Sequence, residues 1–285
     1  MILAVAGIRL GVHISISAGF ARVPDEAKEL GCNTFQVFTR NPRGWRSTPL
    51  KEDEVIEFRE KVRQYDEIPV AHASYLPNLA SPKDDIWRLS LTSVIDELKR
   101  CGELGIPYFV LHMGSHLGAG FEVGFKRLVE GCDQALKKAD NNVILLLENM
   151  AGQKNSMGSR FEDIGRVLRA IEYQDRIGMC LDSCHAFQAG FDYRSRRGLK
   201  KMLQELDRHV GIARVKVLHL NDAENAVGSG LDRHYHIGLG YIGEEGFRNL
   251  LHVEEFRGLP WILETPVDKT RGWKENLEAV RRFAE

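Results

Sequence analysis

The sequence predicts an α/β protein that folds as a single (β/α)8 barrel, the TIM-barrel fold. Short aliphatic runs alternate with longer amphipathic segments along the whole chain, which is typical of repeated βα units. Eight such units occur in 285 residues, a usual length for a closed barrel. An open, doubly wound sheet shows the same alternation, but the count of eight favours the barrel. No linker divides the chain, so we expect one barrel domain over residues 8–285 and an N-terminal extension at residues 1–7.

Eight runs have the length and composition of strands. In chain order they are Ile8–His13, Thr34–Thr39, Val70–Ala73, Tyr108–His112, Val143–Glu148, Ile177–Asp182, Val215–His219 and Trp261–Thr265. Amphipathic stretches between them predict helices at Glu52–Tyr65, Asp85–Leu104, Phe121–Lys138, Phe161–Ile171, Gly198–Val210 and Lys274–Phe283.

Two connections are longer than usual, Thr39–Leu50 and Asp222–Tyr241. Both follow predicted strands, and the loops that follow barrel strands surround the active site. We therefore expect both loops to carry function.

Composition limits the possible partners and surroundings of the protein. Lys and Arg total 39 against 40 Asp and Glu, so the net charge of −1 provides no general attraction to polyanions. If the protein binds nucleic acid, it needs a local basic patch or metal ions. No apolar run approaches the roughly 20 residues that span a bilayer, so we expect a cytoplasmic protein with no membrane partner. The five cysteines form no C-x-x-C pair, which predicts reduced, buried thiols.

Side chains that bind divalent metals stand at the ends of seven of the eight predicted strands. They are His13, His72, His112, Glu148, Asp182, His219 and Glu264, and only the second strand lacks one. The carboxyl ends of barrel strands meet at one mouth, where barrel enzymes keep their sites. Further candidates lie in the adjoining loops: His185, Asp232, His234 and His236. The sequence therefore predicts a metal site built from many strands.

The ligand types indicate which metals and which chemistry are involved. Imidazoles and carboxylates without an obligatory thiolate suit catalytic zinc, manganese or iron, and we do not expect Cys180 or Cys184 to be ligands. One open zinc site uses about three protein ligands and a bridged pair about five or six, so nine suit three ions once His13 and His236 are set aside. Three divalent ions fit the transition state of a phosphodiester better than a neutral sugar.

At these residues the sequence resembles the endonuclease IV family of apurinic/apyrimidinic (AP) endonucleases. The resemblance lies in residues 11–15, 38–45, 72–79, 111–117, 147–153, 181–192, 218–222, 232–234 and 263–265, and it extends from about Ile8 to the C-terminus. It implies an enzyme of the deoxyribonuclease IV type in base excision repair. Such an enzyme hydrolyses DNA 5′ to an abasic site, leaves a 3′-hydroxyl and a 5′-deoxyribose phosphate, and trims blocked 3′ ends.

The resemblance also assigns the ligands to three zinc ions per chain, with manganese as a partial substitute. His72, His112 and Glu148 would hold the first ion. Glu148 would bridge to the second, which Asp182, His219 and Glu264 complete, and His185, Asp232 and His234 would hold the third. Setting aside His13 and His236 follows from the resemblance alone. Glu148 and Glu264 are the expected catalytic residues, and two roles for Glu264 stay open: a ligand only, or a ligand that also orients or deprotonates water.

Recognition of DNA is expected from two loops. Residues 40–46 interleave three arginines with an indole, and Arg43 and Trp45 are our candidates for contacts with the DNA backbone and bases. Tyr75 and Leu76 follow His72 and could wedge into the base stack. The alternative interpretation is that Trp45 and Tyr75 are ordinary half-buried aromatics. Leu239 stands where relatives of this kind are expected to carry a polar residue.

The expected partner is double-stranded DNA that contains abasic sites or blocked 3′ ends, bound by a monomer. Two other classes of function compete with this interpretation. A metal-dependent sugar isomerase on a related barrel would need fewer ligands and typically a lysine near the metals. A non-catalytic DNA-damage binding protein would have no use for an open multinuclear site.

Overall fold

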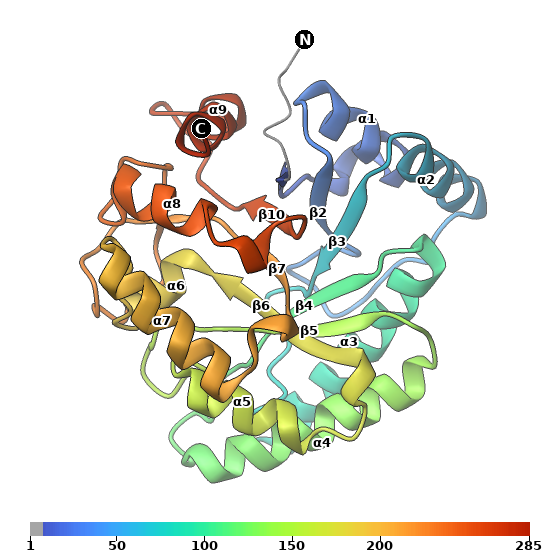
Figure 1. Cartoon of the computed structure of the whole chain (residues 1–285). Helices are drawn as coiled ribbons and strands as arrows, with labels where there is room; N and C mark the ends of the chain where they lie inside the picture. Colours follow the sequence, from blue (N-terminus) through green and yellow to red (C-terminus); the bar gives the residue numbers. More distant parts are fainter. Residues whose placement is uncertain (1–7) are drawn as a thin grey trace.

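The computed structural model describes residues 8–285, and the extension expected at residues 1–7 lies outside them. Eight parallel strands form the barrel: β1 Arg9–Val12, β2 Thr34–Phe38, β3 Ile68–His72, β4 Tyr108–His112, β5 Ile144–Glu148, β6 Ile177–Asp182, β7 Val215–His219 and β10 Pro260–Leu263. Their order is β1-β10-β7-β6-β5-β4-β3-β2, and a parallel bridge between His13 and Gln36 joins the two ends. The predicted barrel is confirmed (Figure 1).

Helices surround the barrel (Figure 1): α1 Val23–Glu29, α2 Glu52–Gln64, α3 Asp84–Leu104, α4 Phe121–Ala139, α5 Phe161–Ala170, α6 Ser183–Gln188, α7 Arg196–His209, α8 Gly243–Leu251 and α9 Trp273–Phe283. Short 3-10 helices occur at Ile16–Ala18, Phe20–Arg22, Gln174–Arg176, Ile212–Arg214 and Glu254–Phe256. The predicted helices agree with these within two residues at each end. The short helices α1, α6 and α8 are additional to the prediction.

The long connection after β7 is an ordered loop and contains a small hairpin, β8 Asp222–Ala223 with β9 His234–Tyr235. The carboxylate of Asp222 is buried and accepts hydrogen bonds from the backbone N–H groups of Ala223, Gly238, Gly240 and Ile242. A Cβ atom at Gly240 would lie 2.4 Å from the carbonyl oxygen of Ala223, so only glycine fits there. Asp222 thereby fixes the loop that carries Asp232 and His234.

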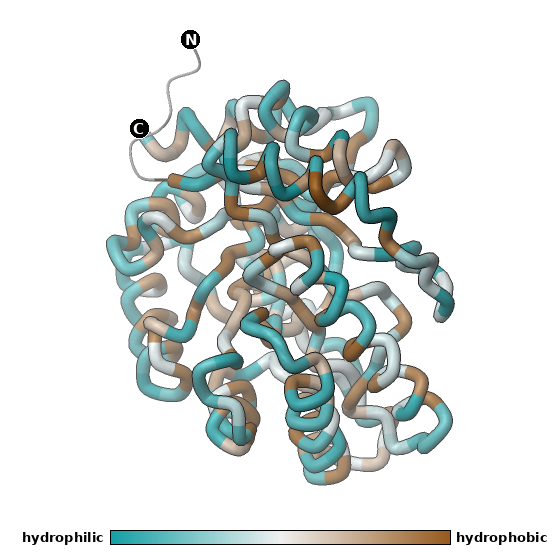
Figure 2. Tube along the Cα trace, turned by 90° about the vertical axis from the view of Figure 1, so that its right-hand side faces the viewer, coloured by the Kyte–Doolittle hydropathy of each residue, from teal (hydrophilic) through white to brown (hydrophobic). Residues whose placement is uncertain are grey.

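Two apolar layers make up the core. One lies between the strands and the helices, and Figure 2 shows the hydrophobic segments along the strands and the inward helix turns. The other fills the barrel interior and consists of Val70, Val110, Leu146, Cys180, Val217 and Ile262, which we call the plug. The plug closes the barrel beneath the carboxyl ends of the strands.

All five cysteines are buried and free, in agreement with the sequence prediction. Burial raises the pKa of Cys180 to about 12, so this thiol is neutral near pH 7. Within residues 8–285, none of the helices is both long enough and apolar enough to traverse a lipid bilayer.

Glu67 is a buried carboxyl group whose two oxygens have no hydrogen-bond partner within the described part of the chain. Burial, with a smaller effect of Asp25, raises its pKa from 4.5 to about 8. The folded protein therefore loses stability as the pH rises from the unfolded pKa through about 8. We expect Glu67→Gln to stabilise the fold by about 2 kcal/mol at pH 9 and by little at pH 5, as measured by thermal unfolding. An equal effect at both pH values would contradict this assignment.

Candidate metal centre

Strand geometry brings six of the predicted ligands into one layer. Along six strands a plug residue precedes a ligand by two positions, with Glu264 directly after the end of β10: Val70 and His72, Val110 and His112, Leu146 and Glu148, Cys180 and Asp182, Val217 and His219, and Ile262 and Glu264. Residues two apart in a strand share a face, so these ligands lie directly above the plug. The spacing of two residues between the plug residue and the ligand is the same in all six pairs.

Helix α6 and the β8–β9 hairpin supply the remaining three ligands. Asp182 caps α6, because its Oδ1 atom accepts a hydrogen bond of 2.6 Å from the backbone N–H of His185. This cap places the His185 imidazole above the end of β6. The hairpin brings Asp232 to the same place, with 3.0 Å between Asp232 Oδ1 and His185 Nε2. His234 Nε2 lies 3.4 Å from His185 Nε2.

Glu148 lies at the centre of the cluster and is completely buried. Its Oε2 atom is 3.2 Å from His72 Nε2 and 3.1 Å from His112 Nε2. Its Oε1 atom is 3.3 Å from His185 Nδ1 and 3.1 Å from His219 Nδ1. One carboxylate thus faces four imidazoles, as expected for a group that bridges two cations.

All nine predicted ligands therefore come together. Three groups have their ligand atoms within 4.8 Å of one another: His72, His112 and Glu148; Glu148, Asp182, His219 and Glu264; and His185, Asp232 and His234. These are the groups that the sequence resemblance assigned to three ions. A fourth overlapping group contains Cys184, but burial raises the pKa of this thiol far above its usual value, which disfavours the thiolate that would bind metal.

The electrostatics of the cluster are those of a site built for cations. Burial alone would raise the pKa of Glu148, yet the charges of His219 and His112 hold it well below its usual value. Burial lowers the pKa of His185, but Asp182, Asp232 and Glu148 raise it well above its usual value. Burial also opposes the charge of Asp232, and its bond to His185 lowers its pKa to about 2. Buried carboxylates that stay ionised need positive partners, and divalent ions fit this requirement.

Backbone carbonyls fix the orientation of two of the imidazoles. His72 Nδ1 lies 2.7 Å from the carbonyl oxygen of Ala73, and His185 Nδ1 lies 2.9 Å from that of Asn149. A carbonyl only accepts, so each Nδ1 carries the proton and each Nε2 presents its lone pair to the cluster. These two side chains are therefore preorganised to bind metal through Nε2.

Two asparagines that sequence reasoning gave no role orient the carboxylates. Asn221 Nδ2 donates to Asp182 Oδ2 at 2.7 Å, and Asn221 Oδ1 accepts from the backbone N–H of Glu264 at 2.8 Å. Asn149 pairs its side-chain amide with the backbone of Asp182 in both directions. The available signal was their position, directly after Glu148 and two residues after His219.

His13 and His236, which the resemblance set aside, do not complete any of these groups. His13 packs on Phe38 with 4.3 Å between ring centroids, and its Nδ1 atom is 3.8 Å from Glu264 Oε1. His236 is buried, and its Nε2 atom lies 3.0 Å from Asp268 Oδ1.

Several of the candidate ligands line a cavity of about 430 Å³ at the barrel mouth. Tyr75 lines it and is 67% exposed, so its ring is available to a ligand. Arg43 is exposed, whereas Trp45 and Leu76 are half-buried. Leu239 is exposed on the loop after β9, beside a different depression.

The three arginines of residues 40–46 do not share one environment. Arg40 is buried, and its guanidinium donates to the carbonyl oxygen of Gly44 and to the hydroxyl of Ser93. It holds the loop in place, which leaves Arg43 and Arg46 as the exposed arginines of residues 40–46. The composition of the loop could not reveal that Arg40 is buried. The sequence alone does not distinguish an arginine that binds backbone carbonyls from one that binds phosphate.

Helix α3 anchors both candidate recognition loops. Glu97 accepts hydrogen bonds from the backbone N–H and the hydroxyl of Ser74, next to Tyr75. Arg100 donates to the carbonyl oxygen of Thr39, at the start of the arginine loop. The two loops also meet directly, since the N–H of Tyr75 donates to the carbonyl oxygen of Pro42 at 3.2 Å.

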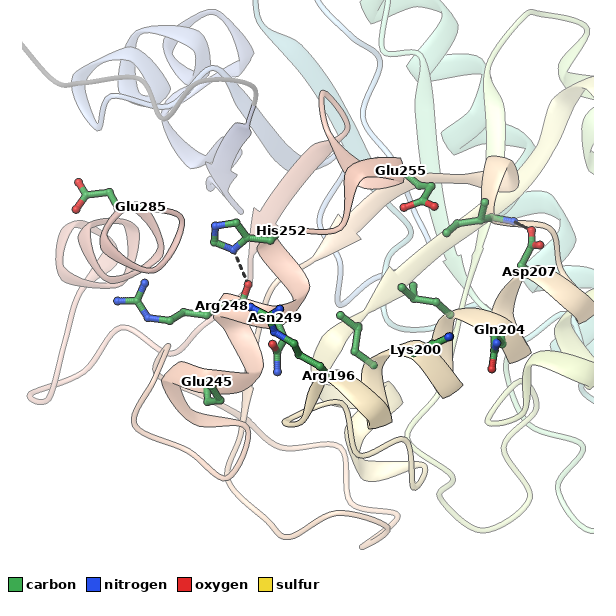
Figure 3. Close-up of a pocket in the computed structure, with 13 residues that line it drawn as sticks. Arg196, Lys200, Gln204, Asp207, Glu245, Arg248, Asn249, His252, Glu255 and Glu285 are labelled. Carbon is green, nitrogen blue, oxygen red and sulfur yellow. Dashed lines mark hydrogen bonds between the residues drawn. The ribbon is translucent and has the colours of Figure 1, made fainter.

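A larger hollow of about 810 Å³ lies on the outside of the barrel, beside α7 and α8 (Figure 3). Charges of both signs surround it, including Arg196, Lys200, Glu245 and Glu255, and His252 bonds the carbonyl oxygen of Arg248. It contains none of the nine clustered ligands, so the smaller cavity at the barrel mouth is the better candidate for a reaction.

Comparison with known proteins gives consistent results. The model of a family described as xylose isomerase-like TIM barrel matches residues 24–283. A protein named "Probable endonuclease 4" from Cenarchaeum symbiosum is 48% identical over 97% of this chain and 100% of its own length. A protein of the same name from Nitrosopumilus maritimus is 45% identical over the same shares. The crystal structure of endonuclease IV from Thermus thermophilus is 36% identical, with a TM-score of 0.86 over 96% of this chain and 98% of that one.

Proposed function

This chain belongs to the endonuclease IV family of xylose isomerase-like TIM barrels, and we propose that it is a zinc-dependent AP endonuclease of DNA repair. In this proposal the enzyme hydrolyses the phosphodiester 5′ to an abasic site and leaves a 3′-hydroxyl and a 5′-deoxyribose phosphate. It also trims blocked 3′ ends, and it acts as a monomer. The observation that carries the proposal is the set of three neighbouring ligand groups, two of which share Glu148, beneath one open cavity.

The donor set fits zinc. Each group combines imidazole nitrogens with carboxylate oxygens, and the thiol that groups with Asp182 and His234, that of Cys184, is held protonated. Three bound zinc ions would supply positive charge for the phosphate and lower the pKa of coordinated water. Manganese could replace zinc in part, since it accepts the same carboxylates and imidazoles less tightly.

Glu264 faces the cavity and is anionic near neutral pH. Burial raises its pKa, but His219, His13 and His72 hold it well below its usual value. A carboxylate whose pKa is low is a weak base and therefore a poor proton acceptor. Of the two roles left open by the sequence, this favours a ligand that accepts a hydrogen bond and orients water over a general base.

The products of incision test the proposed reaction. A lyase would attack the sugar aldehyde with a lysine amine, but none of the described residues that line the cavity is a lysine. We therefore expect cutting of an abasic duplex to leave an end that a polymerase extends directly, and borohydride to trap no covalent adduct. A trapped complex, or a nick that needs end processing before extension, would contradict hydrolysis on the 5′ side. The missing lysine also argues against a sugar isomerase.

Arg43 and Tyr75 are proposed to bind DNA. Arg43→Ala and Tyr75→Ala should each reduce kcat/KM for abasic duplex by about 5- to 150-fold, since loss of one stacking or phosphate contact costs about 1–3 kcal/mol. Both variants should keep the wild-type metal content, because neither residue belongs to a ligand group. Arg63→Ala, an exposed arginine on α2, is the matched control. Wild-type efficiency in both loop variants under limiting enzyme would show that the loop assignment is wrong.

A further inference from the structure

Strand β2 contributes no metal ligand, but it places an amide inside the cluster. Gln36 is paired in register with Val70 of the plug and is completely buried. It therefore replaces an apolar side chain at the level of the plug, directly beneath the ligand layer. A buried amide at such a position must find hydrogen-bond partners to offset its loss of hydration.

Gln36 finds its partners among residues of the metal centre. Its Nε2 atom is 2.6 Å from Glu264 Oε1 and 3.0 Å from His13 Nδ1. Its Oε1 atom is 2.8 Å from His219 Nε2. Both ends of the amide are thus engaged, one by a carboxylate and the other by an imidazole.

The chemistry of these partners leaves one consistent arrangement of protons. The Glu264 carboxylate only accepts, so the amide NH2 must face it and the amide oxygen must face His219. Because an amide oxygen only accepts, His219 Nε2 must carry a proton. The lone pair of His219 is then on Nδ1, which lies 3.1 Å from Glu148 Oε1 and 3.2 Å from Glu264 Oε2.

We propose that Gln36 is a positioning residue that fixes the tautomer of His219 and the rotamer of Glu264, and so prepares the group Glu148, Asp182, His219 and Glu264 for its ion. Backbone carbonyls do this for His72 and His185, whereas for His219 a side chain does it. The identity of the ion as zinc rests on the proposed function, but the role of Gln36 does not depend on DNA cleavage.

Gln36→Met tests the proposal, because methionine has a similar volume and lacks the amide. Loss of a residue that orients ligands typically lowers metal affinity 10- to 100-fold. We expect one of the three zinc ions to be lost to a chelator at about 10- to 100-fold lower concentration than in the wild type, while the other two ions stay. Elemental analysis after dialysis against graded chelator measures this without any DNA.

Thr34→Val is the matched control. Thr34 is buried two residues earlier in β2, and its hydroxyl donates to the carbonyl oxygen of Ile68, away from the ligands. It should lower thermal stability in the absence of metal without changing zinc retention. Wild-type zinc retention in Gln36→Met would overturn the proposal.

A second measurement uses the wild-type protein and does not depend on how the variant folds. Nitrogen NMR of the zinc-loaded enzyme distinguishes the two imidazole tautomers, and we expect His219 to carry its proton on Nε2. A proton on Nδ1 would overturn the proposal even if incision were normal. Conversely, failure of the wild type to cut abasic DNA while these results hold would count against the proposed function alone.

Discussion

Glu148→Gln is expected to reduce incision of abasic DNA by about 1,000-fold or more, since removal of one preorganised charge contact alone costs about 100- to 1,000-fold in other enzymes. Glu148 belongs to two of the three ligand groups, and four imidazole nitrogens lie 3.1–3.3 Å from its oxygens. The amide NH2 of glutamine cannot accept a bond from a cation or an imidazolium. It would point a donor at ligands that need an acceptor, at a completely buried position.

The control for Glu148→Gln is Glu130→Gln, which makes the same change on the exposed face of α4. Steady-state incision, metal analysis and far-UV circular dichroism should be measured on both variants. We expect fewer than three ions in Glu148→Gln with a retained fold, and wild-type behaviour in the control. Full metal content together with wild-type turnover would show that Glu148 does not bridge the ions.

The positions of the ligands could be predicted because they follow from the period of a strand. His72, His112 and Glu148 each end a short aliphatic run, and parallel strands of a barrel bring such ends together whatever the exact boundaries. The third predicted strand was placed two residues too late at its start, yet His72 still fell at the mouth. Errors of this size leave the layer of ligands intact.

The residues that orient the ligands could not be predicted in the same way. Gln36, Asn149 and Asn221 act through neighbours that are distant in the sequence, such as Glu264 for Gln36, 228 residues away. The sequence around an amide inside an aliphatic run does not indicate which residues will be its hydrogen-bond partners. Arg40 illustrates the same limit, because the composition of residues 40–46 does not distinguish this buried arginine from the exposed Arg43 and Arg46.

Removal of the metal ions with a chelator should abolish incision and lower the melting temperature by about 20 °C or more. A site held at 1,000 times its Kd stabilises the fold by about 4 kcal/mol. In proteins of this size each kcal/mol corresponds to about 2–4 °C, so three sites reach this magnitude. Without metal, the buried carboxylates of Glu148 and Asp182 and the half-buried carboxylate of Glu264 stay close together, and they depend on protonated histidines for compensation.

The pH dependence of this difference shows whether protons replace the metal. The pKa of His185 is raised well above its usual value by Asp182, Asp232 and Glu148, although burial lowers it. Its stabilisation of the metal-free protein is therefore complete below the unfolded pKa of about 6.5, and it is lost as the pH rises through the higher folded value. The difference in melting temperature between zinc-loaded and metal-free protein should widen between pH 6 and pH 9, and zinc uptake should release protons. A difference that stayed constant or narrowed over this range would mean that His185 does not hold a proton in the empty site.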